Sequence, residues 1–393
     1  MNNYDVLIIG GGSAGITAAA RIRNRGLFKK IAIIEPSQNH YYQPLWTLVG
    51  NGLVEKEITE KPMKSVIPEG VTWLQESAVK LDPEANSVQT NKASYQYKYL
   101  IVATGIIPDW SFAEGLAETI GKNNVCSVYT YETAELCFDT VKNLEKGNLF
   151  FTMPMGLLKC GGAPQKIMWL TDDYCRRFKK RDDFTFNFVK EGNGIFGVEK
   201  YKKVLDQLVI ERDIKTMYHS KLIKVDGENK TATFKNLETG EETTQDYALL
   251  HVVPHFKTHD FISTSSLAND KGEVEVDAHT LQSTRFPNVF SLGDCSSCPT
   301  GKTGAAIRKQ APVLVENLHS YHEGKTLEKK YNGYTACPIL TRHNRVLLAE
   351  FDYDGNPVES FPFNQAQESY LMFLFKRYLL PWLYWNLMLR GLI

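Results

Sequence analysis

The chain has 393 residues, enough for two or three domains, and its 45 basic and 45 acidic residues give a formal net charge of zero. This balance argues against a nucleic-acid partner and offers no overall attraction to an anionic membrane. Seven cysteines, an odd and modest number for this length, argue against a secreted disulfide scaffold. The first apolar run starts within five residues of Met1, so we expect a cytoplasmic chain without a signal or transit peptide.

The N-terminal segment has the pattern of a dinucleotide-binding unit. Residues 5–9 form an apolar run typical of a buried parallel strand, and Gly10, Gly12 and Gly15 follow as G-x-G-x-x-G before a helical pattern. Glycines allow a pyrophosphate to approach the positive end of a helix. Glu35 ends the next apolar run, where a carboxylate can accept hydrogen bonds from a ribose. The unit predicts an adenine dinucleotide, and the alternative is a glycine-rich turn that binds nothing.

Two later segments are apolar strands that end in a glycine turn, YLIVATG (residues 99–105) and FPNVFSLGDC (residues 286–295). With the N-terminal unit they resemble the flavoproteins that have two dinucleotide-binding domains. This resemblance implies FAD, with Asp294 at the ribityl chain and a following helix that points at the flavin. It also suggests cofactor contacts from Ala78, Thr104 and Gly105.

The same resemblance implies an α/β protein with two Rossmann-like dinucleotide-binding domains, one inserted into the other. We predict that residues 1–115 and 271–320 form the FAD-binding domain and that residues 116–270 form the inserted domain. Residues 321–393 form a C-terminal region that ends in amphipathic, membrane-docking helices.

The inserted domain lacks the glycine fingerprint of an NADH-linked enzyme where it would be expected. The apolar run of residues 148–154 continues as MGLLKCGGAPQK, which contains Cys160 instead. A G-x-G-x-x-G pattern does occur at Gly192, Gly194 and Gly197, but no acid ends the following strand candidate. We therefore predict that this second match is a loop and not a nucleotide site.

Four motifs in order resemble sulfide:quinone oxidoreductases, in particular the branch that includes the mitochondrial enzymes. They are HYYQPLWTLVG, KCGGAPQKIMWL, SLGDCSSCPTGKT and GYTACPILT, and the similarity covers nearly the whole chain. The resemblance implies that Cys160 and Cys337 are redox partners that meet on one face of the flavin. It also implies a set of supporting residues: Glu35, Gln43, Asp294 and Lys302 at the cofactor, Lys166 beside the sulfur, and Lys376 as a second cation for that role.

This family resemblance implies a specific chemistry. Hydrogen sulfide attacks a disulfide or trisulfide between Cys160 and Cys337, leaves a persulfide on Cys337 and releases Cys160 as a thiolate. Electrons then pass through FAD to a membrane quinone, and a small acceptor such as sulfite, glutathione or polysulfide removes the sulfane sulfur. A nearby cation would lower the pKa of the thiol. The alternative for any single cysteine is a buried, small apolar residue.

The remaining cysteines and the histidines are expected to be structural. Cys295 and Cys298 form C-x-x-C without a second ligand pair, and the histidines have no defensible ligand spacing, so we predict no metal site. Some relatives carry a third essential cysteine ahead of the inserted domain. Tyr129 stands at that point here, with Cys126 three positions earlier, so we expect noncovalent FAD.

Residues 369–393 are rich in Leu, Phe, Trp and Tyr. The longest uncharged stretch, residues 378–389, is 12 residues long, whereas a bilayer span needs about 20. We expect two short interfacial helices separated near Pro381, with Lys376, Arg377 and Arg390 at the rim. This predicts a peripheral, monotopic protein on the cytoplasmic face of a bacterial inner membrane. The alternative is a core-packing or dimer helix pair in a homo-oligomer.

Two other functions stay open from the sequence alone. A type II NADH:quinone oxidoreductase-like flavoenzyme would take its electrons from NADH. A noncatalytic flavin redox sensor would bind a partner without turnover.

Overall fold

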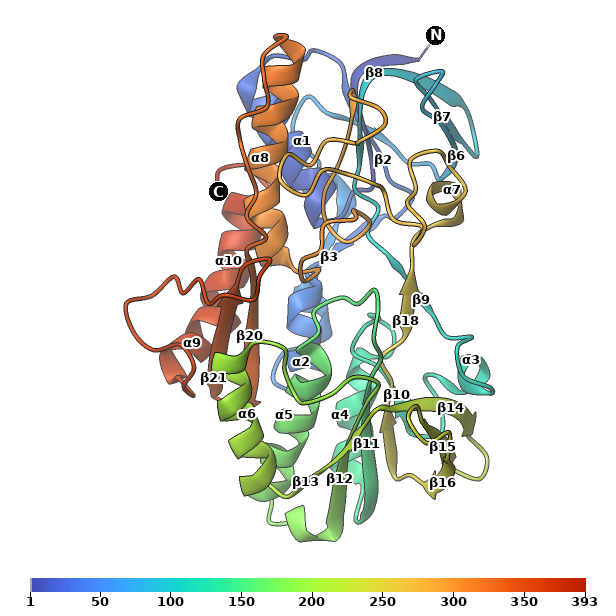
Figure 1. Ribbon diagram of the computed structural model, residues 1–393, viewed down its shortest axis with the longest axis vertical. Coiled ribbons are helices and arrows are strands. Elements are labelled where there is room, and N and C mark those ends of the chain that lie inside the picture. The colour runs from blue at the N-terminus through green and yellow to red at the C-terminus, as the bar shows by residue number, and fades with distance from the viewer. Residues whose placement is uncertain (1) are drawn as a thin grey trace.

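The computed structural model describes residues 2–393, and two largely parallel β-sheets dominate it (Figure 1). The first sheet has the order β5-β2-β1-β8-β7-β6, with β19 paired to β8. Its strands are β1 (Asn3–Ile9), β2 (Ile31–Ile34), β5 (Thr72–Leu74), β6 (Ala78–Asp82), β7 (Ser87–Thr90), β8 (Ser94–Val102) and β19 (Val289–Ser291).

The centre of this sheet is parallel and buried on both faces. β1 pairs in parallel with β2 and β8, and β19 pairs in parallel with β8. Val6, Leu7 and Ile8 have no exposed surface, which explains why the strand is a continuous apolar run without alternation. β6 and β7 extend the sheet as an antiparallel ribbon. The two strands at 99–105 and 286–295 therefore join the N-terminal unit in one sheet.

The turn between β1 and α1 (Ser13–Arg25) needs its glycines. Gly10 has φ +103°, and a Cβ there would lie 2.4 Å from the Ala103 carbonyl oxygen. A Cβ on Gly15 would lie 1.9 Å from the Gly10 carbonyl oxygen. The long helix α8 (Gly304–His322) packs against α1 on one side of the sheet (Figure 1).

The second sheet has the order β10-β17-β11-β12-β13, and all of its pairs are parallel. Its strands are β10 (Val125–Cys126), β11 (Gly147–Met153), β12 (Phe184–Lys190), β13 (Ile214–Tyr218) and β17 (Leu249–His251), and its helices are α4 (Ala134–Asn143), α5 (Ala163–Arg177) and α6 (Glu199–Glu211). The prediction of two Rossmann-like units is confirmed. The sequence pattern did not reveal the antiparallel sheet beside it, β14 (Ser220–Asp226), β15 (Thr231–Asn236) and β16 (Glu242–Asp246).

The chain passes between the two large sheets at an antiparallel pair, β9 (Ile107–Asp109) and β18 (His255–Lys257). Figure 1 shows this pair as the narrow link on one side of the molecule. The domain boundaries at 115 and 271 stay a prediction. The short elements are β3 (Asn39–Tyr41), β4 (Glu60–Pro62), α2 (Trp46–Val49), α3 (Leu116–Thr119), α7 (Asp260–Ser263) and the 3₁₀ turns η1 (Gln43–Leu45), η2 (Lys56–Thr59), η3 (Met63–Ser65) and η4 (Arg181–Asp183).

The C-terminal region adds a hairpin, β20 (Thr335–Arg342) and β21 (Arg345–Phe351), which packs on α5 through β20. The helices that follow are α9 (Tyr370–Leu374), the π-helical turn η5 (Phe375–Leu379), α10 (Leu380–Leu383) and the π-helical turn η6 (Tyr384–Met388). These four form one continuous run of residues 370–388, so the expectation of two helices separated near Pro381 is wrong. A proline disturbs the helical hydrogen bond to the residue four positions earlier, and the wider π turn just before it absorbs that disturbance.

Candidate active site

Cys160 lies in the loop between β11 and α5, just ahead of the N-terminus of that helix. Its backbone is held at both ends: the Cys160 N–H donates to the Lys302 carbonyl at 3.0 Å, and the Tyr129 hydroxyl donates to the Cys160 carbonyl at 3.3 Å. Cys160 has φ +39°, which is uncommon for a residue with a side chain. The loop therefore fixes where this sulfur points.

Cys337 reaches the same place from β20. Its Sγ lies 3.8 Å from the Sγ of Cys160, although the two residues are 177 positions apart in the chain. The side chain of Cys337 is 5% exposed, and that of Cys160 is half-buried. The gap is wider than the ~2 Å of a disulfide bond, so the two sulfurs here are separate thiols.

Gly162 makes this approach possible. A Cβ on Gly162 would lie 2.2 Å from the Cys337 sulfur, inside the distance that any two non-bonded atoms tolerate. The CGG sequence therefore supplies both the first sulfur and the space for the second one.

Lys166, one turn into α5, places an ammonium group beside the two cysteines. Its Nζ donates to the Cys160 sulfur at 3.2 Å, and the residue is 3% exposed. The pKa of Cys160 is held below its ordinary value because Cys337 donates a hydrogen bond to it and because Lys166 lies beside it, against the opposing effect of burial. The hydrogen bond that Cys337 makes to Cys160, together with burial, raises the pKa of Cys337. The contact with Lys166 thus favours ionisation of Cys160 over that of Cys337.

Lys376 supplies a second buried cation from the C-terminal helical run. Its Nζ donates to the Pro44 carbonyl at 2.9 Å, and the residue is 3% exposed. Burial, with the charge of Lys166 as a second cause, lowers its pKa to about 7. Lys376 therefore lies inside the protein, and its expected place at the membrane rim is wrong.

The N-terminal loop fits the diphosphate and ribose of a dinucleotide. A Cβ added to Gly12, Gly105 or Gly304 would meet no atom within 4 Å, so open space lies over all three turns. The Glu35 carboxylate accepts the N–H groups of Gly11 at 2.7 Å and Ser37 at 2.8 Å, which orients it at the end of β2. FAD would be held here by the N–H groups at the start of α1 and by Glu35.

Asp294 and Lys159 lie close to each other, in the loops that follow β19 and β11. Burial raises the pKa of Asp294, and the ammonium groups of Lys159 and Lys302 oppose that rise. Lys159 donates to the Gln43 side-chain oxygen at 3.3 Å and lies over the ring of Phe256. Lys159 is not among the residues predicted from the sequence, although a cation directly beside Cys160 in the chain was a usable signal.

The other predicted cofactor residues lie in different settings. The Lys302 ammonium donates to the carbonyls of Ser296 at 2.5 Å and Cys298 at 3.1 Å, so it braces the loop after Asp294. Thr104 and Gly105 follow β8, and Gly105 has φ +69°. Ala78 begins β6, paired with Thr90. The roles of these residues at the cofactor stay predictions.

The remaining cysteines are enclosed. Cys295 is 0% and Cys298 2% exposed, and burial raises the pKa of both thiols. Cys126 is fully buried on β10, while Tyr129 contacts the Cys160 loop. Within residues 2–393 no three His, Cys, Asp or Glu side chains gather in a metal-binding group.

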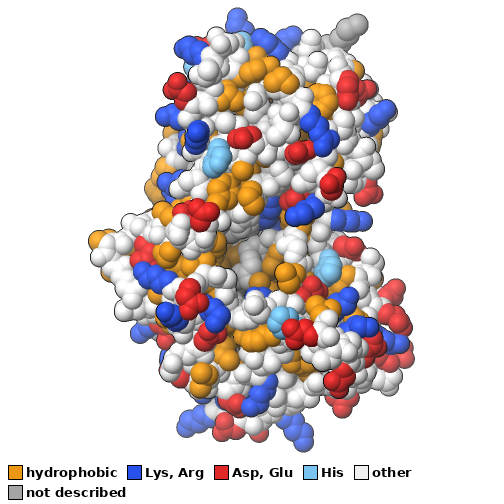
Figure 2. All heavy atoms as spheres, in the orientation of Figure 1, with side chains coloured by type: hydrophobic (Ala, Val, Ile, Leu, Met, Phe, Trp, Pro, Cys, Tyr) orange, Lys and Arg blue, Asp and Glu red, His pale blue; other side chains and the backbone are white. Residues whose placement is uncertain are grey.

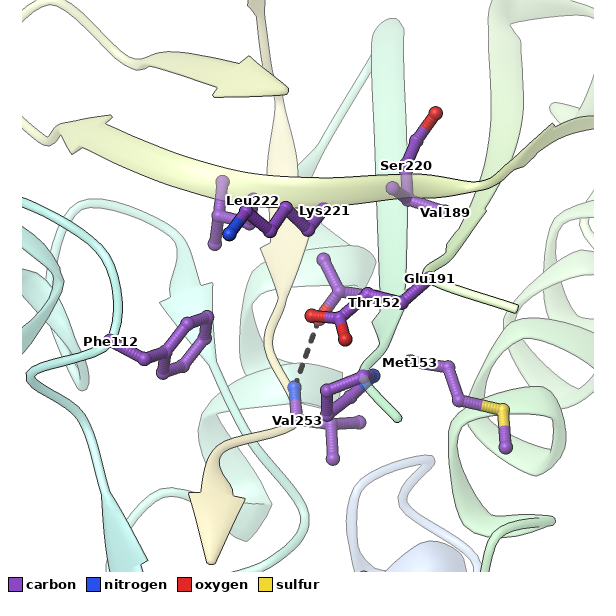
Figure 3. A pocket seen from close by; sticks show the side chains of 10 residues that line it. Phe112, Thr152, Met153, Val189, Glu191, Ser220, Lys221, Leu222 and Val253 are labelled. Atoms are coloured by element: carbon purple, nitrogen blue, oxygen red, sulfur yellow. Dashed lines mark hydrogen bonds between the residues drawn. The ribbon is translucent and has the colours of Figure 1, made fainter. Parts of the chain in front are cut away.

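The inserted domain has a crevice at the carboxyl ends of β11 and β12, the usual place for a nucleotide in such a sheet. The protein's own side chains enter it: Figure 3 shows Glu191, Thr152 and Lys221 together there, with the Thr152 hydroxyl accepting the Val253 N–H at 3.1 Å. Gly192, Gly194 and Gly197 lie in the loop between β12 and α6, as predicted. Lys190 donates to the Gly194 carbonyl at 2.8 Å, so a side chain already uses that loop backbone.

Comparison with known proteins defines the family. Residues 4–146 match the model of the pyridine nucleotide-disulphide oxidoreductases. A mitochondrial sulfide:quinone oxidoreductase of Dictyostelium discoideum is 44% identical over 396 residues, covering 99% of this chain and 87% of the relative. The chain belongs to the sulfide:quinone oxidoreductase family.

A solved sulfide:quinone oxidoreductase, from the bacterium Aquifex aeolicus, has the same fold. It superposes with a TM-score of 0.84 over 100% of this chain and 92% of that one, at 20% identity. A type II NADH:quinone oxidoreductase of Staphylococcus aureus is 27% identical over only 116 residues, or 29% of this chain. The NADH-linked enzymes are thus distant relatives.

Proposed function

We propose that this sulfide:quinone oxidoreductase carries its sulfur on Cys160 and Cys337, with Lys166 as the cation that stabilises the leaving thiolate. The single observation that carries this assignment is the 3.8 Å approach of two sulfurs that lie 177 positions apart in the chain, with an ammonium 3.2 Å from one of them. No other pair of thiols combines a half-exposed member with a buried cation in residues 2–393.

The working form of the pair is an oxidised bridge, either a disulfide or a trisulfide. Two bonds of ~2 Å that meet at one bridging sulfur span a gap close to the one observed. Hydrosulfide attacks the Sγ of Cys337, so one S–S bond forms there while the bond from that Sγ toward Cys160 breaks. The electron pair of the broken bond stays on the Cys160 side, as a thiolate if the bridge is a disulfide or as a persulfide anion if it is a trisulfide, and sulfide sulfur is now held as a persulfide on Cys337.

The surroundings favour that direction of cleavage. Lys166 contacts Cys160, so negative charge is stabilised on Cys160. The Tyr129 hydroxyl and the Lys302 carbonyl hydrogen-bond the backbone of Cys160 and so fix the orientation of its side chain. FAD, when bound, supplies two-electron chemistry between the thiolate and a quinone. Sulfide thus loses two electrons and a quinone gains two electrons and two protons.

The sulfane sulfur leaves to a small nucleophile. We propose sulfite, glutathione or polysulfide, because each can attack the outer sulfur of a persulfide and regenerate the Cys337 thiol. Cys337 is nearly buried whereas Cys160 is half-buried, so a small acceptor fits this site better than a protein.

We propose that FAD is bound without a covalent bond. Tyr129, whose hydroxyl bonds the Cys160 carbonyl, takes the place of the third cysteine of some relatives, and Cys126 is fully enclosed. Acid precipitation of the yellow protein should release all flavin into the supernatant, whereas yellow precipitate would contradict noncovalent binding.

We propose that the protein docks peripherally on a quinone-containing membrane through the C-terminal helical run. No helix within residues 2–393 is long and apolar enough to cross a bilayer. The finer assignment to the cytoplasmic face of a bacterial inner membrane stays a prediction, and the relative from Dictyostelium discoideum is mitochondrial. A homo-oligomer also stays a prediction.

Anaerobic reduction tests the function directly. Sulfide should bleach the flavin absorbance of the holoenzyme, whereas NADH should leave it oxidised. Cys160→Ser and Cys337→Ser should each retain FAD and lose sulfide-dependent quinone reduction, with Cys298→Ser as a buried-cysteine control near wild-type activity. Bleaching by NADH but not by sulfide would sink the function, and near-normal turnover of either redox-cysteine variant would sink the residue assignment.

A further inference from the structure

A buried hydrogen-bond chain joins the C-terminal helical run to the dinucleotide loop. The hydroxyl of Tyr384 lies 2.7 Å from the Ser13 Oγ and 2.5 Å from the His40 Nε2. The other ring nitrogen of His40 lies 2.9 Å from the Gly11 carbonyl oxygen. Tyr384 is 4% and His40 2% exposed, so water does not compete for these bonds.

The direction of each bond follows from the chemistry. A carbonyl only accepts, so the Nδ1 of His40 carries the proton that goes to Gly11. Burial lowers the pKa of His40 to about 4, so the ring is neutral near pH 7 and Nε2 is an acceptor. The Tyr384 hydroxyl therefore donates to His40, and its oxygen accepts the proton of Ser13. Each of the three donors in this hydrogen-bond chain, the His40 Nδ1 and the hydroxyls of Tyr384 and Ser13, therefore already has an acceptor.

The hydrogen-bond chain reaches the dinucleotide loop at two residues, one on each side of Gly12. Gly11 and Ser13 flank Gly12, where open space lies over the N-terminus of α1. Because Ser13 donates to Tyr384, its hydroxyl proton is not available to a phosphate, and the backbone N–H groups face the ligand alone. The loop is thus bonded to a residue 371 positions away in the sequence.

A second set of contacts binds the end of the chain to the same helix. The Asn24 side chain donates to the Arg390 carbonyl at 2.9 Å. A Cβ on Gly391 would lie 2.7 Å from the Arg21 backbone nitrogen, so the two backbones are in direct contact. The C-terminal segment is therefore seated along α1 from its first residue to its last turn.

We propose that Tyr384 is a positioning residue for the FAD diphosphate loop, and that cofactor binding and seating of the C-terminal helical run stabilise one another. The proposal builds on FAD binding and membrane docking as put forward above. Because coupling between two binding equilibria is reciprocal, FAD should tighten the C-terminal segment as much as the segment tightens FAD. The enzyme would then present its docking helix firmly only when it carries its cofactor.

Tyr384→Phe removes only the hydroxyl and leaves the ring packed on Tyr42, whose centroid is 4.4 Å away. Tyr378→Phe is the matched control, because Tyr378 belongs to the same helical run but is 60% exposed. The apoprotein of each is titrated with FAD by flavin fluorescence. We expect affinity to fall about tenfold in Tyr384→Phe, the loss typical of a buried hydrogen bond, and to stay unchanged in the control.

Ser13→Ala tests the link from the cofactor side and leaves the C-terminal helices unaltered. Limited proteolysis of apo and holo forms should show that FAD protects the C-terminal segment in wild type, and that this protection shrinks in Ser13→Ala and Tyr384→Phe. Wild-type affinity and full protection in both variants would overturn the proposal. If wild-type apoprotein fails to bind FAD at all, the proposed function fails with it, which separates the two outcomes.

Discussion

The two sulfurs approach each other only because one residue between them has no side chain. A Cβ on Gly162 would lie 2.2 Å from the Cys337 sulfur. A Cβ on the neighbouring Gly161 would meet its nearest atom at an ordinary 3.4 Å. Neither glycine has positive φ, so an alanine would be tolerated by the backbone at both positions. Space for the second sulfur, and not turn geometry, explains the glycine at 162.

We predict that Gly162→Ala pushes the Cys337 sulfur away and lowers sulfide-dependent quinone reduction by on the order of 100-fold, because misplacement of reacting groups by about 1 Å has effects of that size. Gly161→Ala is the matched control and should stay near wild type. Steady-state rates and FAD content of both variants check this. Equal activities of the two variants would show that the β20–β21 hairpin shifts to accommodate the methyl group and that Gly162 is not required for the approach of the two sulfurs.

Lys376 gives the sulfur pair a pH-dependent partner. Its pKa of about 7 lies below the ordinary value for lysine, so its ammonium supports the Cys160 thiolate below about pH 7 and loses its charge as the pH rises through 7. Because the pKa of Lys376 is lower in the folded protein than in the unfolded chain, Lys376 carries its proton in the unfolded chain but not in the folded protein between about pH 7 and 10. The contribution of Lys376 to folding stability therefore increases with pH across that range.

We predict that Lys376→Met slows the alkylation of reduced Cys160 by iodoacetamide several-fold at pH 6 and has little effect at pH 9. The rate is measured by mass spectrometry of the Cys160 peptide, because other thiols also react. Lys203→Met is the control, since that side chain is 74% exposed. An unchanged rate at pH 6 would mean that Lys166 alone stabilises the thiolate.

At the scale of elements, the C-terminal helical run has one inward and one outward face. Lys376 and Tyr384 point into the protein, and Arg377 donates to the Leu53 carbonyl. The outward face carries large apolar side chains that are 45–60% exposed: Tyr370, Leu371, Tyr378, Leu379 and Trp382. Of the three basic residues expected at the rim, Arg390 is the exposed one. Such an apolar face fits burial in a headgroup region.

We predict that Leu379→Glu combined with Trp382→Glu releases the protein from phospholipid vesicles, with affinity reduced by at least tenfold, because each side chain gains about 1.5–3 kcal/mol on burial. Ile210→Glu on α6 is the control, since Ile210 is 76% exposed and lies on another element. Co-sedimentation measures the binding. If the double variant still sediments with vesicles but changes from dimer to monomer, the face is a protein interface instead.

At the scale of the whole molecule, the proposed site is assembled from the two large sheets and the C-terminal hairpin. The dinucleotide loop and Asp294 belong to the first sheet, Cys160 and Lys166 to the second, and Cys337 to the hairpin that packs on α5. Figure 2 shows the molecule hollowed between its two halves, with hydrophobic side chains along the border. The β9–β18 pair and the C-terminal region join these halves, so the proposed sulfur–flavin geometry would depend on their relative position.

Local patterns were sufficient for the first Rossmann-like unit and for the missing glycine fingerprint after β11, whereas the second unit and the choice of Cys160 and Cys337 came from the family resemblance. Strand, turn and helix signals depend on neighbouring residues, which a sequence displays directly. Family resemblance, and not spacing, supplied the pairing of the cysteines.

Only the tertiary structure decided the 3.8 Å sulfur contact, the inward Lys376, the unbroken helix through Pro381 and the bond between Tyr384 and Ser13. These features join residues that lie up to 371 positions apart, and each depends on the packing of whole elements. A short pattern contains no information about which distant element will cover it, because that choice is made by the summed burial of many side chains.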